Sequence, residues 1–295
     1  MSDASLQSGM QPWIQFECLQ LEVGAHVAEL DAVDVGAFQV VRERQLAGVQ
    51  KLGITPADVC TISSCTPDPN VRFTQFRTGA VDEVFFLPAR TEFDVYVPAT
   101  ALTRYVSFSQ EAFLDAVRTL DPAGWADARS LHVIPGARQA DFDAAVDLLL
   151  ELPDSEQART IGLHALASLV TAAPGAPPSY RERLFSYQIC RWARAYIEGQ
   201  FDRGQAPSIV DVCREVKVSR RRLEYAFREY AGVAPLQYIR RTRLSRVRAA
   251  LRKGDRRSTS VTEVALQFGF VHLSRFAQDY ARMFGELPSQ TLARR

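Results

Sequence analysis

The stretch VALQFGFVHLSRFAQDY at residues 264–280 contains two apolar runs with the spacing of short helices, separated by Gly269-Phe270. Upstream, VDVCREVKVSRRRLEYAF at residues 210–227 repeats this pattern. Apolar residues three and four positions apart lie on one face of a helix, so each run predicts a helix that buries one side. The chain therefore contains a duplicated pair of short helices, with a sharp bend inside each pair.

The residues that flank each pair are repeated as well. Ser208 and Ser260 both precede a carboxylate by three residues, which is a helix capping signature, and Pro235 in the first copy matches Pro288 in the second. Two short helices packed across a tight turn form a helix-turn-helix unit, whose second helix can lie in the DNA major groove. We expect Gly269 to supply a positive φ at the second bend. An ordinary helical bundle is the alternative, but a bundle needs no duplicated, positively charged units.

Charge is divided unevenly along the chain, although the formal net charge is only +1. Residues 181–295 hold 24 Lys and Arg against 11 Asp and Glu, whereas residues 1–180 hold 11 basic and 23 acidic residues. A strongly basic segment joined to an acidic one predicts that only the basic segment meets a polyanion. An arginine-rich surface that merely contacts solvent is the alternative.

The motifs of the basic segment are more specific than its charge. The pattern S-x-x-x-L-x-x-x-F-x-x-x-x-G-x-x-P-x-x-Y-x-x-x-x-R-L, then G-F-x-x-x-S-x-F-x-x-x-Y-x-x-x-F-G-x-x-P-S, resembles the DNA-binding domain of the AraC-type family of bacterial transcription regulators. In this sequence it is carried by Ser219, Leu223, Phe227, Gly232, Pro235, Tyr238, Arg243, Leu244, Gly269, Phe270, Ser274, Phe276, Tyr280, Phe284, Gly285, Pro288 and Ser289. The match covers residues 190–293, and the whole chain looks most similar to the ethanolamine-operon regulator branch.

The resemblance implies a division of the chain and a set of partners. Residues 1–172 would form a regulatory, effector-binding and dimerisation domain, residues 173–180 a linker, and residues 181–295 the DNA-binding domain. The implied partners are double-stranded operator DNA, RNA polymerase, a small effector of unknown identity and a second copy of the chain. We expect no cofactor, no metal and no catalytic residue, so the expected protein is an effector-responsive regulator rather than an enzyme.

The second helix of each unit would turn its unburied face to DNA. The expected DNA-binding residues are Ser219, Arg220, Arg221, Arg222, Glu224, Tyr225 and Arg228 in the first unit and His272, Leu273, Ser274, Arg275 and Gln278 in the second. Arginine can donate two hydrogen bonds to guanine and Glu can accept one from cytosine, and each such pair discriminates by about 1–3 kcal/mol. The second face is nearly uncharged, and its His272 and Gln278 replace the acidic cap and the arginine usual in the family. We therefore expect the first unit to carry most of the affinity, with Gln278 reading adenine and Arg275 contacting a base or phosphate.

A long helix is expected between the two units. The segment PLQYIRRTRLSRVRAALRK, Pro235 to Lys253, has Leu236, Leu244, Val247 and Leu251 as its apolar stripe. A helix of 19 residues spans roughly 28 Å, which can place two recognition helices about one DNA turn apart. Four arginines of this helix and two that follow it are expected either to contact DNA phosphates or to lie exposed to solvent. They are Arg240, Arg241, Arg246, Arg248, Arg256 and Arg257.

The first part of the chain has the character of an antiparallel β-barrel. From residue 13 to residue 109, short β-prone runs alternate with Gly and Pro, and amphipathic helices are expected near residues 110–120, 139–151 and 155–172. The expected fold class is thus α+β: an antiparallel, cupin-like β-barrel with helices, followed by an all-α domain with two helix-turn-helix units. The cupin likeness and a dimerising role for the helices of residues 139–172 come from the resemblance. In the stretch ARTEFDVYVP, residues 89–98, polar and apolar residues alternate, so one face of the expected strand is polar. That polar face would line an effector pocket or face solvent.

Other functional classes receive less support. The four histidines are scattered, and the five cysteines form no C-x-x-C pair, which argues against a metal site and a disulfide framework. An enzyme fused to a DNA-binding module would use Cys60 or Cys65 as a nucleophile, against the simpler reading of both as structural thiols. A purely structural DNA-bending protein would not need a large acidic β domain. No apolar stretch is long enough to span a membrane and no signal peptide is visible, so we expect a cytoplasmic protein.

Overall fold

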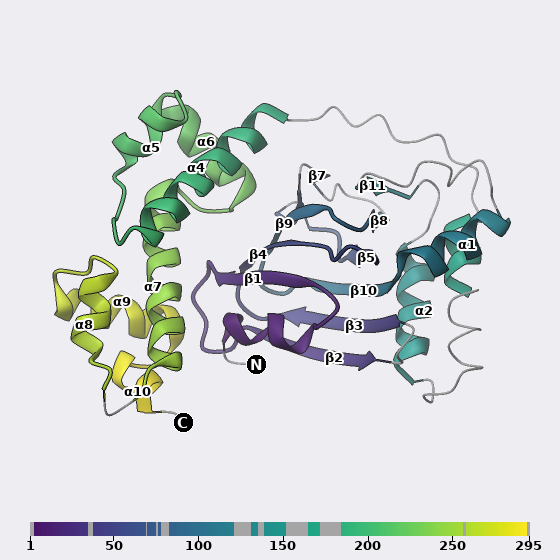
Figure 1. Cartoon of the computed structure of the whole chain (residues 1–295), viewed down its shortest axis with the longest axis horizontal. Helices are drawn as coiled ribbons and strands as arrows, with labels where there is room; N and C mark the ends of the chain where they lie inside the picture. The colour runs from purple at the N-terminus through teal and green to yellow at the C-terminus, as the bar shows by residue number, and fades with distance from the viewer. Residues whose placement is uncertain are drawn as a thin grey trace.

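The computed structural model describes residues 3–34, 38–68, 70–74, 76–77, 83–120, 131–134, 139–151, 165–171, 184–255 and 258–293. Two antiparallel sheets form the N-terminal part, and helices form the C-terminal part beside them (Figure 1). The predicted α+β fold is therefore confirmed. The expected linker at residues 173–180 and the arginines Arg256 and Arg257 lie outside the described residues.

The first sheet has five strands in the order β1-β4-β9-β6-β7. Their bounds are Gln15–Gln20 (β1), Val49–Ile54 (β4), Glu92–Val97 (β9), Arg72–Phe73 (β6) and Phe76–Arg77 (β7). The second sheet has six strands in the order β11-β8-β5-β10-β3-β2. Their bounds are His132–Val133 (β11), Val84–Leu87 (β8), Val59–Cys65 (β5), Leu102–Ser109 (β10), Phe38–Gln45 (β3) and Ala28–Asp34 (β2).

The second sheet is covered on both faces at its centre: β8 is buried throughout and β5 almost throughout, whereas the edge strand β2 keeps several exposed residues. One face packs on helices α1 (Gln110–Leu120) and α2 (Gln139–Glu151) and on the helical residues 165–171. The other face, with Phe85, Leu87 and Tyr105, packs against the first sheet. The helices expected at 110–120 and 139–151 are confirmed, and only residues 165–171 of the expected 155–172 helix are described.

The C-terminal helices build two small cores along one long helix. Their bounds are Leu184–Asp202 (α4), Ile209–Glu215 (α5), Arg220–Tyr230 (α6), Pro235–Lys253 (α7), Val261–Gln267 (α8), Leu273–Phe284 (α9) and Pro288–Ala293 (α10). The first half of α7 packs with α4, α5 and α6, and its second half packs with α8 and α9. Figure 1 shows the two helix pairs at opposite ends of α7.

Helix α7 has the predicted bounds but a different buried stripe in its first turns. Tyr238 and Ile239 are buried there, whereas Leu236 is 63% exposed, so its assignment to the stripe was wrong. Further along, Leu244, Val247 and Leu251 are buried as expected. The change of buried face along α7 lets one straight helix serve two separate cores.

Candidate DNA-binding interface

The first unit consists of α5 and α6. The Ser208 hydroxyl accepts a hydrogen bond from the backbone of Asp211, whose carboxylate accepts one from the Ser208 backbone, so the predicted capping box is present. Ser219 caps α6 by accepting a hydrogen bond from the Arg222 backbone at 3.3 Å. Between the helices, Lys217 has φ 53°, a left-handed conformation that few non-glycine residues adopt.

The predicted recognition face of α6 is open to solvent. Leu223, Ala226, Phe227 and Tyr230 form the buried stripe. On the opposite side, Ser219, Arg220, Arg221, Arg222, Tyr225 and Arg228 are exposed and Glu224 is partly buried. The Arg220 guanidinium lies 3.1 Å from the Glu224 carboxylate, so this pair is preorganised on the face. The arrangement offers arginine donors, a carboxylate acceptor and an aromatic ring on one helix surface.

The second unit consists of α8 and α9. Ser260 caps α8, and Gly269 has φ 75° at the bend, as predicted. Gly269 stands where Lys217 stands in the first unit, so the same left-handed bend is built once with glycine and once with lysine. His272, Leu273, Ser274, Arg275 and Gln278 are exposed on or beside α9. His272 occupies the N-cap position and makes no side-chain capping bond.

Most of the described α7 arginines are engaged within the protein. The expectation that they contact phosphates or solvent is wrong for Arg248, which is buried between Asp3 and Glu286, and for Arg246, which pairs with Glu198 and Asp202. Separately, Arg241 donates to the backbone oxygen of Leu21, and Arg240 pairs with Asp279. These cations hold helices and domains together instead of forming an open phosphate-binding row.

A buried ion pair joins the first sheet to the helical domain. Asp94 on β9 pairs with Arg194 on α4, and both side chains are at most 10% exposed. Gln50 donates to the Asp94 carboxylate at 2.8 Å. Burial raises the pKa of the Asp94 carboxyl, and the Arg194 guanidinium opposes that shift. Arg191 and Glu92 form a second, exposed pair beside it.

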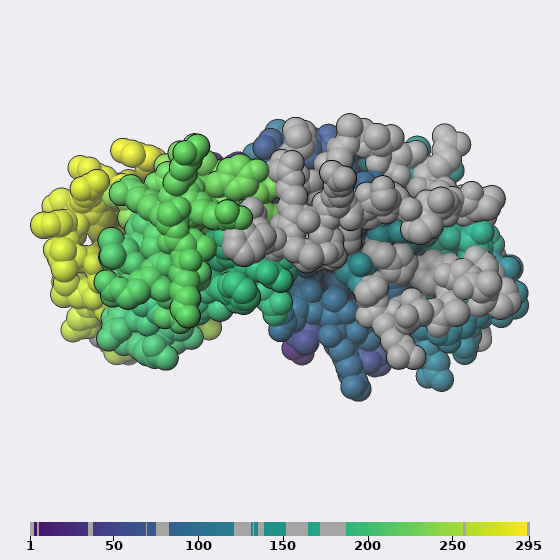
Figure 2. Space-filling model, turned by 90° about the horizontal axis from the view of Figure 1, so that it is seen from above, coloured from purple at the N-terminus to yellow at the C-terminus, as the bar shows by residue number. Residues whose placement is uncertain are grey.

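Both helix-turn-helix units also contact the N-terminal domain through backbone groups. In the last turn of α6 the Glu229 carbonyl accepts from Arg72, and just beyond the helix Gly232 lies directly against the Tyr96 ring. At the end of α9, the Met283 carbonyl accepts from the Gly24 backbone at 3.1 Å. The N-terminal domain therefore contacts both units, and Figure 2 shows the two domains side by side.

The expectation for the polar face of β9 is wrong for Asp94 and Tyr96, which are buried, whereas Glu92 is exposed to solvent as one alternative had it. Glu92 and Asp94 pair with arginines of α4, and Tyr96 lies against the turn after α6, so this face meets the helical domain. On the other face, the apolar Phe93 and Val95 line a cavity between the sheets. Alternation along a strand shows that the two faces differ, but it does not show what covers each face. Only the partner charges on α4, about a hundred residues away, could have pointed to this contact.

The cysteines proposed for the enzyme alternative are poor nucleophiles in this structure. Cys60 and Cys65 are buried on β5, and burial raises the pKa of each thiol, that of Cys65 to about 12. A thiol with so high a pKa provides almost no thiolate at neutral pH. Within the described ranges, no group of three or more His, Cys, Asp or Glu is placed to hold a metal ion. No described helix combines the length and apolarity that a membrane crossing requires.

Taken together, the two exposed recognition helices and their capped partner helices define a double helix-turn-helix DNA-binding domain. Comparison with known proteins agrees. Residues 212–294 match the family described as a helix-turn-helix domain. The XylDLEGF operon transcriptional activator of Pseudomonas putida is 47% identical over 75 residues, which are 25% of this chain and 23% of the relative.

A further relative and a solved structure each match a little over a third of the chain. The probable thc operon regulatory protein of Rhodococcus erythropolis is 35% identical over 118 residues, covering 38% of this chain and 35% of the relative. The crystal structure of a transcriptional regulator with an AraC-type DNA-binding domain from Chromobacterium violaceum is 30% identical, with a TM-score of 0.34, and covers 37% of this chain and 92% of that one. The resemblance to AraC-type regulators is therefore confirmed for the helical domain.

The family match is concentrated in the helical domain. The chain spans about a quarter of the length of the XylDLEGF operon activator described above. The narrower resemblance to ethanolamine-operon regulators stays a prediction.

Proposed function

We propose that this protein is a sequence-specific transcription regulator that reads two adjacent major grooves and responds to a small effector in its N-terminal domain. The observation that carries the proposal is the pair of exposed recognition faces, on α6 and α9, at the two ends of α7. A helix of 19 residues is roughly 28 Å long, close to the ~34 Å repeat of one DNA turn. Two grooves on one side of a duplex are therefore within reach of a single chain.

The first unit is proposed to supply most of the base readout. Arg221 is exposed on α6 and no ion pair within the described residues engages it, so its guanidinium is available to a guanine edge. On α9 the corresponding surface presents Ser274 and Gln278, which can hydrogen-bond but offer no charge to phosphates. Arg275 adds one cation beside them. Affinity and its salt dependence should therefore depend mainly on α6.

Binding to duplexes selected from a random DNA library tests this proposal. At fixed salt, Arg221→Ala should weaken specific binding by about 1–3 kcal/mol, because one bidentate base contact is lost. Arg214→Ala is the matched control, since it removes one exposed cation from α5, outside the proposed face. Gln278→Ala should have a smaller effect than Arg221→Ala. The ranking of the units is wrong if Gln278→Ala weakens binding more.

Control by an effector is supported by the position of β9. Phe93, Val95 and Val97 of this strand line the cavity between the sheets, while Asp94 holds α4 of the helical domain. A ligand that shifts β9 would therefore act on the Asp94–Arg194 pair without contacting the helical domain. The effector, RNA polymerase and a second copy of the chain are proposed partners.

A further inference from the structure

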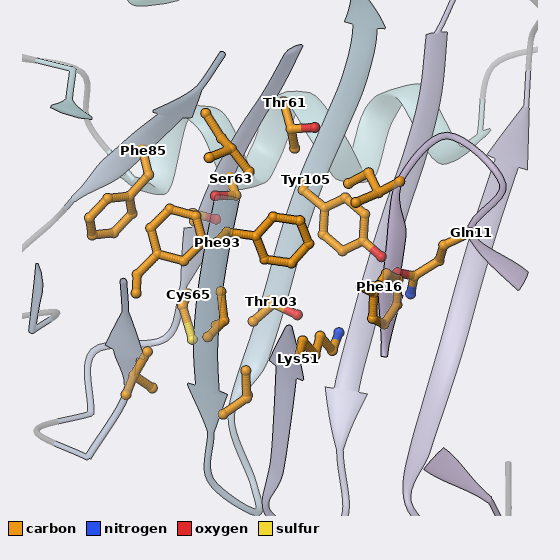
Figure 3. Close-up of a pocket in the computed structure, with 17 residues that line it drawn as sticks. Gln11, Phe16, Lys51, Thr61, Ser63, Cys65, Phe85, Phe93, Thr103 and Tyr105 are labelled. Atoms are coloured by element: carbon orange, nitrogen blue, oxygen red, sulfur yellow. The ribbon is translucent and has the colours of Figure 1, made fainter. Parts of the chain in front are cut away.

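The cavity between the two sheets has a mostly aromatic and aliphatic wall. Figure 3 shows side chains from both sheets directed into it. Phe16 and Phe93 meet at 6.5 Å between ring centroids on one side, and Phe73 and Phe85 meet at 4.9 Å on the other. The cavity has a volume of about 80 Å³. An engineered apolar cavity that admits benzene measures roughly 150 Å³, so a ligand of about five or six heavy atoms enters this cavity only if its wall moves apart slightly on binding.

The charge at the cavity wall is already neutralised. Of the described residues that line the cavity, Lys51 alone carries a formal charge. Its ammonium lies 2.6 Å from the carboxylate of Glu43, which is fully buried and also accepts hydrogen bonds from the amides of Gln7 and Gln11. A third charge brought into this space would lose its hydration without gaining a partner of its own, which is unfavourable. The wall therefore disfavours both anions and cations.

One polar group at the wall has no partner. The Tyr105 side chain on β10 is buried, and its hydroxyl makes no hydrogen bond within the described structure. Figure 3 shows the ring reaching into the cavity with the hydroxyl towards Phe16 and Gln11. Burial raises the pKa of this hydroxyl well above its ordinary value, so the group stays protonated and can donate. A buried donor without an acceptor is unfavourable and is satisfied when an acceptor arrives.

Three other hydroxyls at the cavity wall are already occupied. Thr61 is paired with Ser107 at 3.0 Å, Ser64 donates to the Asp143 carboxylate at 2.5 Å, and Thr103 donates to a backbone oxygen at 3.4 Å. Tyr105, which is buried and unpaired, is therefore a group at which a ligand gains a hydrogen bond without breaking an existing one. This distinguishes the cavity from an ordinary packing defect, which would be lined by apolar atoms alone.

We propose that this cavity binds a small, uncharged, largely apolar molecule that accepts one hydrogen bond from Tyr105. This proposal deepens the proposed function by giving the chemical class of the effector. Only the regulatory role of the bound molecule rests on the proposed function. The proposal excludes acids and amines as ligands of this site. Alcohols, ketones and aldehydes of about five or six heavy atoms have the required chemistry and fit after a slight outward movement of the wall. Ligands of this size can bind measurably because very small ligands gain the most binding energy per heavy atom.

Four probes of similar size separate charge from hydrogen bonding: cyclopentanol, cyclopentane, cyclopentylamine and cyclobutanecarboxylate. Binding to the full chain is measured by saturation-transfer NMR at neutral pH, where the amine and the acid are charged. We expect cyclopentanol to bind at least about tenfold more tightly than either charged probe. Stronger binding of the acid or the amine, or no binding of cyclopentanol, overturns the proposal.

Tyr105→Phe tests the hydrogen bond while keeping the ring. It should weaken cyclopentanol binding by about three- to tenfold, the range of a single net hydrogen bond, and leave cyclopentane binding unchanged. Retained cyclopentane binding shows that the variant is folded. Equal affinity of the variant and the wild type for cyclopentanol contradicts the proposed contact. Binding of selected DNA by the ligand-free protein is measured separately, so failure of the ligand proposal can be told from failure of the proposed function.

Discussion

Replacement of Gly232 by alanine should loosen the contact between the two domains. Gly232 has φ 66°, and a Cβ atom added there would lie 2.8 Å from the Tyr96 ring of the N-terminal domain. Gly204 has φ 71° but no atom within 4 Å of its Cβ position, so Gly204→Ala is a matched control. The left-handed conformation costs alanine about 1–2 kcal/mol at both sites. Overlap with a packed ring adds about 1–3 kcal/mol at Gly232 alone.

Urea unfolding followed by tryptophan fluorescence measures the two variants. Gly232→Ala should lower the free energy of unfolding by about 1–3 kcal/mol more than Gly204→Ala does. When Tyr96→Ala is combined with Gly232→Ala, the additional loss should disappear, because the ring that causes the overlap is absent. Equal destabilisation by the two glycine substitutions would refute the reasoning that the N-terminal domain packs against this turn.

Three other predictions concern the bends, the thiols and the buried ion pair. Gly269→Ala should destabilise the protein by about 1–2 kcal/mol in thermal unfolding, whereas Lys217→Gly at the equivalent bend should be neutral or stabilising; the opposite order would contradict the assignment of both bends. Cys213, the one partly exposed cysteine, should react with iodoacetamide first at pH 8, because the other four are buried; mass spectrometry of the labelled sites checks this. Arg194→Met should destabilise the protein by about 3–5 kcal/mol in urea unfolding by leaving Asp94 buried without its cation, and a loss below about 1 kcal/mol would show that the pair is not buried.

Features set by neighbouring residues could be predicted from the sequence. The capping box at Ser208, the positive φ of Gly269 and the bounds of the 19-residue helix α7 depend on residues a few positions apart, and all three are confirmed. The buried stripe of α6 follows in the same way from its apolar spacing. The DNA-contacting roles of the exposed residues remain predictions, because exposure is necessary for such contacts but does not demonstrate them.

Features set by distant residues could not be predicted in this way. Arg248 looks like any surface arginine of a basic helix, yet Asp3 and Glu286 bury it from both sides. Asp94 alternates with apolar neighbours whether its face meets water or Arg194, so the local pattern is the same in both cases. A count of the basic residues in the helical domain therefore overestimates how many arginines are available to bind DNA.

Hydroxyl-radical footprinting of the full chain on a selected duplex tests the central claim most directly. If α6 and α9 lie in adjacent major grooves, two protected segments should appear on one side of the duplex, about 10 base pairs apart from centre to centre. Protection of a single groove, or of two segments on opposite sides of the duplex, would contradict the claim that both units of one chain bind DNA together.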